Sequence, residues 1–426
     1  MSEAERTASA FPTAIGANAP QMDMTQMLFN PFLPEVHADP YPHYRRLRET
    51  EPIHQPFPGA FMLSRHRDVV PLFRSPNVSS DRRKSPMYDL FLQSLPDPQR
   101  FKDIPQSMLF LDPPDHTRLR GLVNKAFTAR VVESMRPRVQ AIVDGILDEV
   151  GERGSLDIVA DLAYPIPVTV ICDLFGVPNE DRAQVRRWSL DLIYTLDPLV
   201  AGDRLEKAAA AGMAFREYLR GMIEDRRSQH GDDFLSALIQ AEEEGERLTD
   251  EEIVSMCVLL LIAGHETTSG LIGNGMLALG RHPDELRRLR EGLQEDPGLI
   301  RAAVEELLRF DAPVQLTGRL VLEPIDVDGV GIEAGNDVIA LLGGANRDPE
   351  VFEDPERLDV TRKNNHHVAF GGGIHFCLGA PLARLEGQIA VGELVKRFAR
   401  LEIDSEKAQL RDTVTLRGLT SLPATI

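Results

Sequence analysis

Residues 370–379 read Phe-Gly-Gly-Gly-Ile-His-Phe-Cys-Leu-Gly, and a helical pattern over 378–399 follows them. Three consecutive glycines allow backbone geometries that other residues rarely adopt, and they let the chain approach a ligand closely. The free N–H groups at the start of a helix carry positive potential, which stabilises a thiolate. A buried structural cysteine in a glycine-rich turn is the alternative, because free cysteine behaves mostly as a small hydrophobe.

The whole pattern around this cysteine, F-G-G-G-x-H-x-C-x-G-x-x-x-A-R over 370–384, resembles the haem-binding signature of the cytochrome P450 family. The resemblance implies that Cys377 is the thiolate ligand of the iron in haem b (iron protoporphyrin IX). It also places Phe370, Gly371 and Gly379 in the cofactor-binding loop, where Gly379 leaves room for a flat group beside the sulfur. The fold that it implies is mainly α with small β-sheets: a single-domain triangular prism that holds the haem between a long central helix and the cysteine loop.

A long helix is predicted over 250–281, because Thr249 and Glu252 form a capping box at its start and His282-Pro283 ends it. Such a helix is about 45 Å long at 1.5 Å per residue. Its centre, 258–264, is apolar all round, which is typical of a helix that passes through the middle of a large core.

The segment Ala263-Gly264-His265-Glu266-Thr267-Thr268 interrupts this apolar helix with polar groups that need partners. One explanation is a bent helix whose threonines hydrogen-bond to their own backbone. The segment also looks like the oxygen-activating motif of the same family. The resemblance then implies that Ala263 and Gly264 open a groove for dioxygen, that Thr267 hydrogen-bonds the activated oxygen, and that Glu266 relays protons from solvent.

Two further motifs precede the cysteine loop. Glu306-Leu307-Leu308-Arg309 places opposite charges three residues apart on one helix face, a pattern that is common on solvated helices. Its position before Cys377 is similar to the family's E-x-x-R motif, which implies a structural ion network with Arg357 as the third member. His116 and Arg120 share a helix face and resemble the family's haem-propionate contact, and Arg319 and His375 match two more propionate donors.

The rest of the chain fits one large, mainly helical unit. Besides 250–281, amphipathic helices are predicted over 133–151, 180–194, 203–228, 232–244, 284–292 and 297–309. Short strands are predicted at 53–54 and 60–63 and from Arg319 to Leu342. Residues 1–30 lack periodicity and are predicted to form an irregular arm, which leaves 31–426 as a single haem-thiolate domain.

Composition excludes several classes of protein. The 426 residues carry 47 Lys and Arg against 66 Asp and Glu, a formal charge of −19, which argues against a nucleic-acid binder. No stretch approaches the roughly 20 apolar residues that span a bilayer, and the N-terminus lacks a signal-peptide pattern. The three cysteines, Cys172, Cys257 and Cys377, form no metal-binding or disulfide pattern. These features predict a cytoplasmic protein without a membrane partner, expected to be a monomer.

The resemblance implies a monooxygenase that uses dioxygen to hydroxylate or epoxidise a lipophilic molecule such as a fatty acid, terpenoid, steroid or macrolide. Leu259, Leu260, Ala312, Val314 and Leu316 are expected to line the substrate pocket. A peroxide-driven peroxygenase and a haem sensor without turnover are the alternatives; the pair Glu266-Thr267 favours the monooxygenase over the first, and no sensor output domain is visible for the second.

Electrons are expected from a ferredoxin and its NAD(P)H-dependent reductase, because the sequence leaves no room for a reductase domain. Between His116 and Arg138 the chain carries six Lys and Arg and one Glu, a local charge of +5. A basic stretch of this kind, set in an acidic protein, is predicted to dock an acidic ferredoxin.

Overall fold

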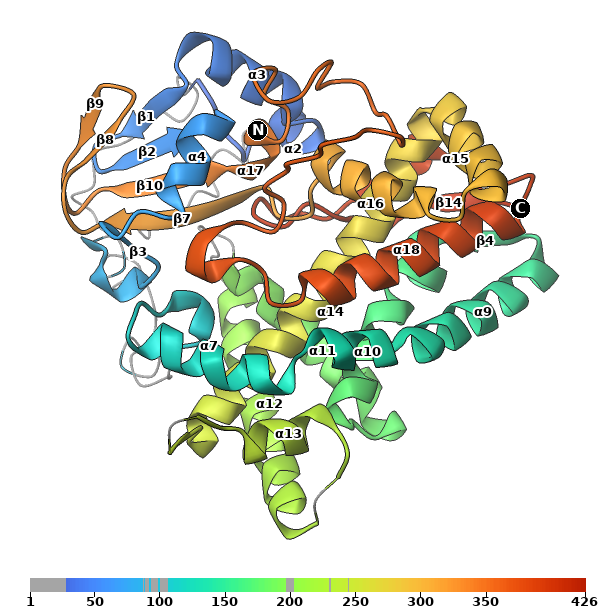
Figure 1. Cartoon of the computed structure of the whole chain (residues 1–426), viewed down its shortest axis with the longest axis horizontal. Coiled ribbons are helices and arrows are strands. Elements are labelled where there is room, and N and C mark those ends of the chain that lie inside the picture. The colour runs from blue at the N-terminus through green and yellow to red at the C-terminus, as the bar shows by residue number, and fades with distance from the viewer. Residues whose placement is uncertain are drawn as a thin grey trace.

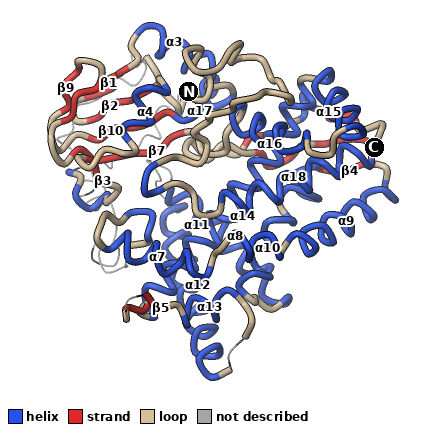
Figure 2. The backbone as a smooth tube through the Cα atoms, in the orientation of Figure 1, coloured by secondary structure: helices blue, strands red, loops and turns tan. Residues whose placement is uncertain are grey.

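The computed structural model describes residues 28–86, 88, 92, 99, 106–196, 203–229, 231–243 and 245–426. Most of the outline is helical and roughly triangular, and the larger sheet lies toward one corner (Figures 1 and 2). The α-helices are α2 (Pro34–Ala38), α3 (Tyr41–Thr50), α4 (His66–Leu72), α7 (Asp115–Ala126), α8 (Ala129–Ser134), α9 (Arg136–Arg153), α10 (Pro165–Phe175), α11 (Arg182–Leu192), α12 (Asp203–Ser228), α13 (Phe234–Gln240), α14 (Asp250–Arg281), α15 (Pro283–Glu295), α16 (Leu299–Phe310), α17 (Leu342–Ala345) and α18 (Ala380–Arg397).

Five small sheets complete the described fold. The largest has the order β1-β2-β10-β7-β3, with β10 parallel to β2 and antiparallel to β7. The others are β11-β14-β4, β12-β13, β5-β6 and β8-β9. The strands are β1 (Ile53–Phe57), β2 (Ala60–Leu63), β3 (Val78–Ser79), β4 (Ser155–Asp157), β5 (Glu242–Glu243), β6 (Glu246–Arg247), β7 (Leu316–Val321), β8 (Ile325–Val327), β9 (Val330–Ile332), β10 (Asp337–Leu341), β11 (Glu402–Ile403), β12 (Gln409–Leu410), β13 (Leu419–Ser421) and β14 (Pro423–Thr425).

Helix α14 passes through the middle of the molecule (Figure 1) and takes part in two hydrophobic clusters. Its N-terminal half, including Ile253 and Leu261, packs in a cluster with α10, α12 and α13. Its C-terminal half, including Leu271 and Leu279, packs in a second cluster with α9, α16 and α18. Residues 263–268 lie between the two halves and belong to neither cluster's buried set. The fold thus brings the polar motif to the boundary between two cores.

The predicted helices agree closely with the structure where caps mark their ends. Helices α12 and α14 begin and end as predicted, and α14 carries the predicted capping box. The prediction of a helix over 232–244 was wrong at its end, because α13 stops at Gln240 and the short hairpin β5-β6 follows. Most of the predicted arm lies outside the described residues; at its end, Phe29 and Asn30 are buried, and the Phe29 ring lies 5.2 Å from that of Tyr44.

Two helical segments, Ile158–Phe175 and Asp250–Arg281, are long and apolar enough to cross a bilayer, so the prediction that no stretch approaches this limit was wrong. In each segment, 67% of the most apolar 18-residue window is buried within the protein, as in core helices.

Candidate active site

The cysteine loop is held by backbone contacts that only glycine permits. The N–H of Cys377 donates to the carbonyl of Phe370 at 3.0 Å. Gly371 and Gly373 adopt φ values of +67° and +63°. A Cβ on Gly373 would lie 1.9 Å from the carbonyl oxygen of Phe73, and one on Gly372 would lie 2.9 Å from the Phe73 ring. The loop therefore presses against the end of α4, and the glycines make this close approach possible.

Cys377 lies near the start of α18, which begins three residues later at Ala380. Burial raises the pKa of its thiol, and the N–H groups of Gly379 and Ala380 and the Arg120 guanidinium oppose that rise. A Cβ on Gly379 would meet only the Cys377 sulfur, at a van der Waals distance of 4.0 Å. The cysteine is therefore placed as a metal ligand needs to be: partly exposed, with positive potential behind it.

The four predicted propionate donors come together from α7, β7 and the cysteine loop. The rings of His116 and His375 lie 4.3 Å apart. The Arg120 guanidinium donates to the carbonyl of Phe376 at 2.8 Å. Burial first, then His116 and Arg319, lowers the pKa of His375 to about 3, and burial lowers the pKa of Arg319 to about 10.

Some polar atoms of these four donors make no hydrogen bond within the described part of the chain. Both ring nitrogens of His116 and Nε2 of His375 are buried and have no hydrogen-bond partner among the described residues. Buried polar atoms without partners cost free energy, and their occurrence beside the guanidinium groups of Arg120 and Arg319 calls for an anion. The carboxylates of a haem fit this set, and the haem iron fits the adjacent thiol of Cys377.

The middle of the central helix carries partly buried residues, although the helix is a core element. These residues are Leu259, Leu260, Ala263, Gly264 and Thr267. The hydroxyl of Thr267 donates to the carbonyl of Ala263 at 2.7 Å, and Thr268 donates to Gly264 at 2.9 Å. Both threonines thus hydrogen-bond to the helix backbone, as the bent-helix explanation predicts. The Thr267 hydroxyl oxygen can still accept hydrogen bonds through its lone pairs.

Glu266 is fully buried and turned toward two basic groups. Its carboxylate contacts His265 Nε2 at 3.0 Å and forms an ion pair with Arg411. Burial alone would raise the pKa of Glu266, but His265 and Arg411 bring it below its usual range. No sequence pattern indicated Arg411, which lies 145 residues away and reaches α14 from the β12-β13 hairpin.

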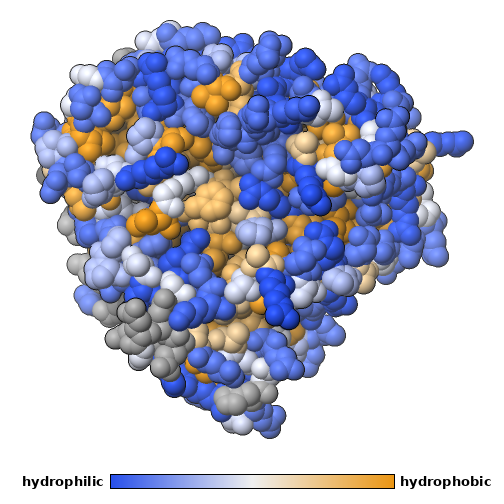
Figure 3. Space-filling view, in the orientation of Figure 1, coloured by the Kyte–Doolittle hydropathy of each residue, from blue (hydrophilic) through white to orange (hydrophobic). Residues whose placement is uncertain are grey.

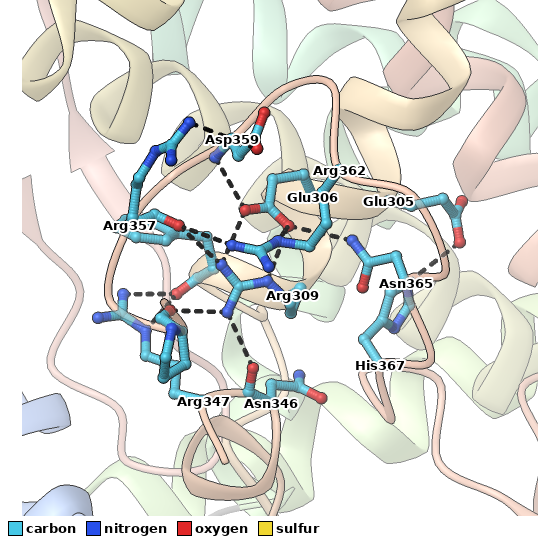
Figure 4. Close-up of polar contacts among 12 residues, drawn as sticks. Glu305, Glu306, Arg309, Asn346, Arg347, Arg357, Asp359, Arg362, Asn365 and His367 are labelled. Carbon is cyan, nitrogen blue, oxygen red and sulfur yellow. Dashed lines mark hydrogen bonds and ion pairs between the residues drawn. The ribbon is translucent and has the colours of Figure 1, made fainter. Parts of the chain in front are cut away.

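The E-x-x-R network is present but its third member differs from the prediction (Figure 4). Arg309 makes two hydrogen bonds to Glu306, at 2.7 and 2.8 Å, and both side chains are fully buried. Arg362 donates to Glu306 at 3.0 Å. The prediction of the Arg357 side chain was wrong: it is 55% exposed, pairs with Asp359, and contributes only its carbonyl, which accepts from Arg309.

The backbone explains this exchange. The N–H of Asp359 donates to Glu306, and the Arg357 carbonyl accepts from Arg309. The backbone of this segment therefore faces the network, and the Arg357 side chain points away from it. A turn closed by the Arg362 N–H and the Asp359 carbonyl then brings Arg362 back (Figure 4).

A second ion cluster, which sequence reasoning missed, lies beside the cysteine loop. Glu305 accepts two hydrogen bonds from Arg384 at 2.7 Å and one contact from His367 at 3.1 Å. The Arg384 guanidinium lies 4.6 Å from the ring centre of Phe370. Burial would raise the pKa of Glu305, but Arg384 and His367 lower it to about 2. Its stabilising effect is therefore full above the unfolded carboxyl pKa and is lost as the pH falls toward 2.

The predicted substrate-pocket residues pack in different hydrophobic clusters. Leu259 and Leu260 pack beside the cluster of α10, α12 and α13, whereas Val314 and Leu316 lie beside two clusters near the large sheet. Ala312 is fully buried in the cluster of α9, α16 and α18, so its assignment to a pocket wall was wrong.

Comparison with known proteins agrees with this geometry. Residues 91–425 match the model of the family described as Cytochrome P450. The chain is 43% identical to Cytochrome P450 107B1 of Saccharopolyspora erythraea, covering 90% of this chain and 94% of that one. It is 43% identical to Vitamin D(3) 25-hydroxylase of Pseudonocardia autotrophica, covering 91% and 94%. The solved structure of the Bacillus subtilis cytochrome P450 PksS of the bacillaene polyketide synthase superposes with a TM-score of 0.84 at 39% identity, covering 93% and 99%.

These matches extend over most of the chain and include the cysteine loop, the central helix and the E-x-x-R helix. The family carries haem, and its bacterial members are the relatives that this chain resembles. The chain belongs to the cytochrome P450 family of haem-dependent monooxygenases.

Proposed function

We propose that Cys377 binds the haem iron and that His116, Arg120, Arg319 and His375 bind the propionates. The observation that supports this most is the set of buried ring nitrogens on His116 and His375 that have no partner among the described residues, 4.3 Å apart ring to ring. Bound there, the haem supplies dioxygen activation, with the thiolate favouring O–O cleavage. Phe370, Gly371 and Gly379 shape the loop, and the network of Glu306, Arg309 and Arg362 fixes the segments beneath it.

The proposed substrate is a lipophilic molecule of polyketide, sterol or fatty-acid type. Leu259 and Leu260 present apolar, partly exposed surface on the central helix, next to Ala263 and Gly264. Such surface orients a substrate by excluding water rather than by hydrogen bonds. One relative is named for vitamin D(3) and another belongs to a polyketide synthase, which supports a large apolar substrate.

We propose that Thr267 and Glu266 manage proton delivery. The Thr267→Ala variant is expected to consume NAD(P)H at a rate close to that of the parent while forming roughly tenfold less product, because a positioned proton donor or hydrogen bond contributes at least this much. The measurement is product formed and peroxide released per NAD(P)H consumed. Thr268→Ala is the matched control, since its hydroxyl makes the same backbone contact one residue on. Full coupling in Thr267→Ala would contradict the role, and full activity with peroxide alone would favour the peroxygenase.

We propose that a ferredoxin docks beside the cysteine loop. Ile374 and Phe376 are 51% and 43% exposed, and Figure 3 shows an apolar area at the middle of this face with hydrophilic residues around it. Lys125 and Arg130 are exposed nearby on the basic stretch. Arg118, Arg136 and Arg138 form ion pairs with Glu252, Glu133 and Asp173, so the positive charge free for a partner is smaller than the sequence count of +5.

Charge reversal at Arg130 tests this surface. Arg130→Glu is expected to slow ferredoxin-dependent reduction by roughly tenfold at low ionic strength, and the difference should shrink as salt screens the charges. Stopped-flow reduction rates measure it, and reduction by dithionite should not change. Arg287→Glu, the same charge change at a 61% exposed arginine of α15, is the matched control. Equal rates for Arg130→Glu and the parent at low salt would exclude Arg130 from the docking surface.

We further propose that residues 31–426 act as one haem-thiolate domain, that the enzyme is cytoplasmic, and that it works as a monomer. The two cores share α14, which supports a single cooperative unit. Size-exclusion chromatography and a single unfolding transition are the expected results, whereas two transitions would divide the domain.

A further inference from the structure

Glu266 and its neighbour His265 form a buried pair whose hydrogen bonds account for every polar atom of the imidazole. Nδ1 of His265 lies 2.6 Å from the carbonyl oxygen of Leu261, and Nε2 lies 3.0 Å from Oε1 of Glu266. The side chains are 2% and 0% exposed. Water therefore does not reach either group directly, and the protein contacts alone determine where the protons lie.

The carbonyl contact fixes one proton. A carbonyl oxygen can only accept, so Nδ1 must carry a hydrogen. If the imidazole were neutral, Nε2 would then be an unprotonated acceptor that faces a carboxylate oxygen at 3.0 Å, and two lone pairs would repel each other in a buried site. The contact is a hydrogen bond only if a further proton lies between Nε2 and Oε1.

A third residue holds the carboxylate in place. Arg411 forms an ion pair with the other oxygen of Glu266, and its side chain is 11% exposed. Its backbone N–H donates to Gly418 at 2.9 Å within the C-terminal hairpin. Arg411 also lines a small cavity, of about 20 Å³, between this hairpin and the N-terminal residues Phe29 and Val36. That volume is enough for one water molecule.

Besides Arg411, the described contacts place one more titratable side chain, that of Tyr164, against the pair. The Tyr164 ring lies edge-on to His265, 5.7 Å between ring centres, and burial raises the pKa of this phenol so that it stays neutral. The Arg186 guanidinium lies over the Tyr164 ring, 4.2 Å from its centre. Across the described contacts, the charged groups that face the pair are thus cations, which favour a carboxylate at Glu266.

We propose that His265 and Glu266 hold one shared proton beside Thr267, and that Arg411 positions their carboxylate. The proton moves from Nε2 to the carboxylate and on toward the oxygen bound near Thr267. A proton from solvent is then relayed back to the pair, so that no electrons move and the pair is restored. His265 is the proton-holding residue and Arg411 is a positioning residue. This inference rests on the proposed proton-delivery role of Glu266 and Thr267.

The protonation state can be measured without turnover. The haem-loaded, full-length protein with ¹⁵N-labelled histidine, in its diamagnetic ferrous carbon-monoxide form, is examined by NMR at pH 7.5. The His265 ring nitrogens are expected to show the imidazolium pattern, or a shared proton with Nε2. In Glu266→Gln the same ring is expected to become the neutral Nδ1–H tautomer. A neutral Nδ1–H ring in the parent protein would overturn the proposal.

His282 provides an internal control in the same spectrum. It makes the same contact, Nδ1 to the carbonyl four residues earlier at 2.7 Å, but its ring faces Phe310 at 5.3 Å between ring centres. We expect His282 to be neutral with the proton on Nδ1 in every variant. An imidazolium pattern at both histidines would show that the carbonyl contact alone produces the signal, which would also overturn the proposal.

Arg411 is tested by the pH dependence of the pair. In Arg411→Gln the Glu266 carboxylate loses a cation, so the pH at which the pair gains a second proton should rise by at least one unit in the NMR titration. Arg411→Lys should restore most of the parent behaviour. Asp412→Asn, at the adjacent 81% exposed residue that pairs with Arg204, should leave the titration unchanged. A titration in Arg411→Gln identical to that of the parent would exclude the positioning role.

Turnover gives the final comparison. His265→Phe, which keeps the ring volume but holds no proton, should lower coupled product formation by roughly tenfold and leave ferredoxin-dependent first-electron reduction unchanged. If coupling stays at the parent level while the shared proton is confirmed by NMR, the pair is structural and the inference fails. If Thr267→Ala is also fully coupled, the proposed proton-delivery function fails as well, so the two outcomes are distinguishable.

Discussion

The Cys377→His variant is expected to bind haem but to lose the strongly red-shifted Soret band of the reduced carbon-monoxide complex. Imidazole can ligate iron, so the cofactor remains, but it does not donate electron density as a thiolate does. Product formation should fall to background. The measurement is the absorption spectrum of the reduced protein under carbon monoxide, together with the haem content of the purified variant.

Cys172→Ala is the matched control for this experiment. Cys172 is fully buried beside α12 and α13, and burial raises the pKa of its thiol to about 11, so it is an inert core residue. This variant should keep the red-shifted band. A band that survived in Cys377→His, or a parent protein that took up no haem, would contradict the assigned ligand.

The second large effect is expected in the network beneath the site. Arg362→Ala removes a cation from Glu306, which is fully buried, and should lower the free energy of unfolding by about 3 kcal/mol, the lower end for breaking a buried charge pair. The lower end applies because Arg309 still neutralises Glu306. Urea denaturation measures the change.

Arg357→Ala separates the structural assignment from the one predicted by sequence. Its side chain is 55% exposed and pairs with Asp359 at 3.6 Å, so the free energy of unfolding should change by less than about 0.5 kcal/mol. Its carbonyl, which accepts from Arg309, remains in the variant. Equal costs at Arg357 and Arg362, or a larger cost at Arg357, would contradict the network in Figure 4.

These two arginines show where sequence reasoning stops. The motif Glu306–Arg309 is local, because residues three apart on a helix face each other, and it was predicted correctly. Which of two arginines in an irregular segment turns inward depends on the path of the backbone, which the sequence pattern does not state. The contacts of Glu266 with Arg411 and of Glu305 with Arg384 were missed for the same reason, since 145 and 79 residues separate the partners.

Other parts followed from local chemistry. The capping box at Thr249 and the stop at Pro283 fixed both ends of the longest helix. The four propionate donors came together as the family resemblance implied, although the assignment of their ligand stays a prediction. Ala312 was misplaced because a small apolar residue suits a core and a pocket wall equally, and only packing distinguishes them.

The position of residues 263–268 between two cores bears on how this enzyme can change. One half of α14 packs with α9, α16 and α18. Helix α16 carries Glu306 and Arg309, and α18 is the helix that follows Cys377. The other half is anchored with α10, α12 and α13. Substitutions of the second cluster's residues on α12 and α13 can therefore change the surroundings of Leu259 and Leu260 without touching the E-x-x-R network. Libraries designed to broaden the range of accepted compounds belong in that cluster. Related enzymes that share the first cluster and differ in the second have one route by which to accept different molecules.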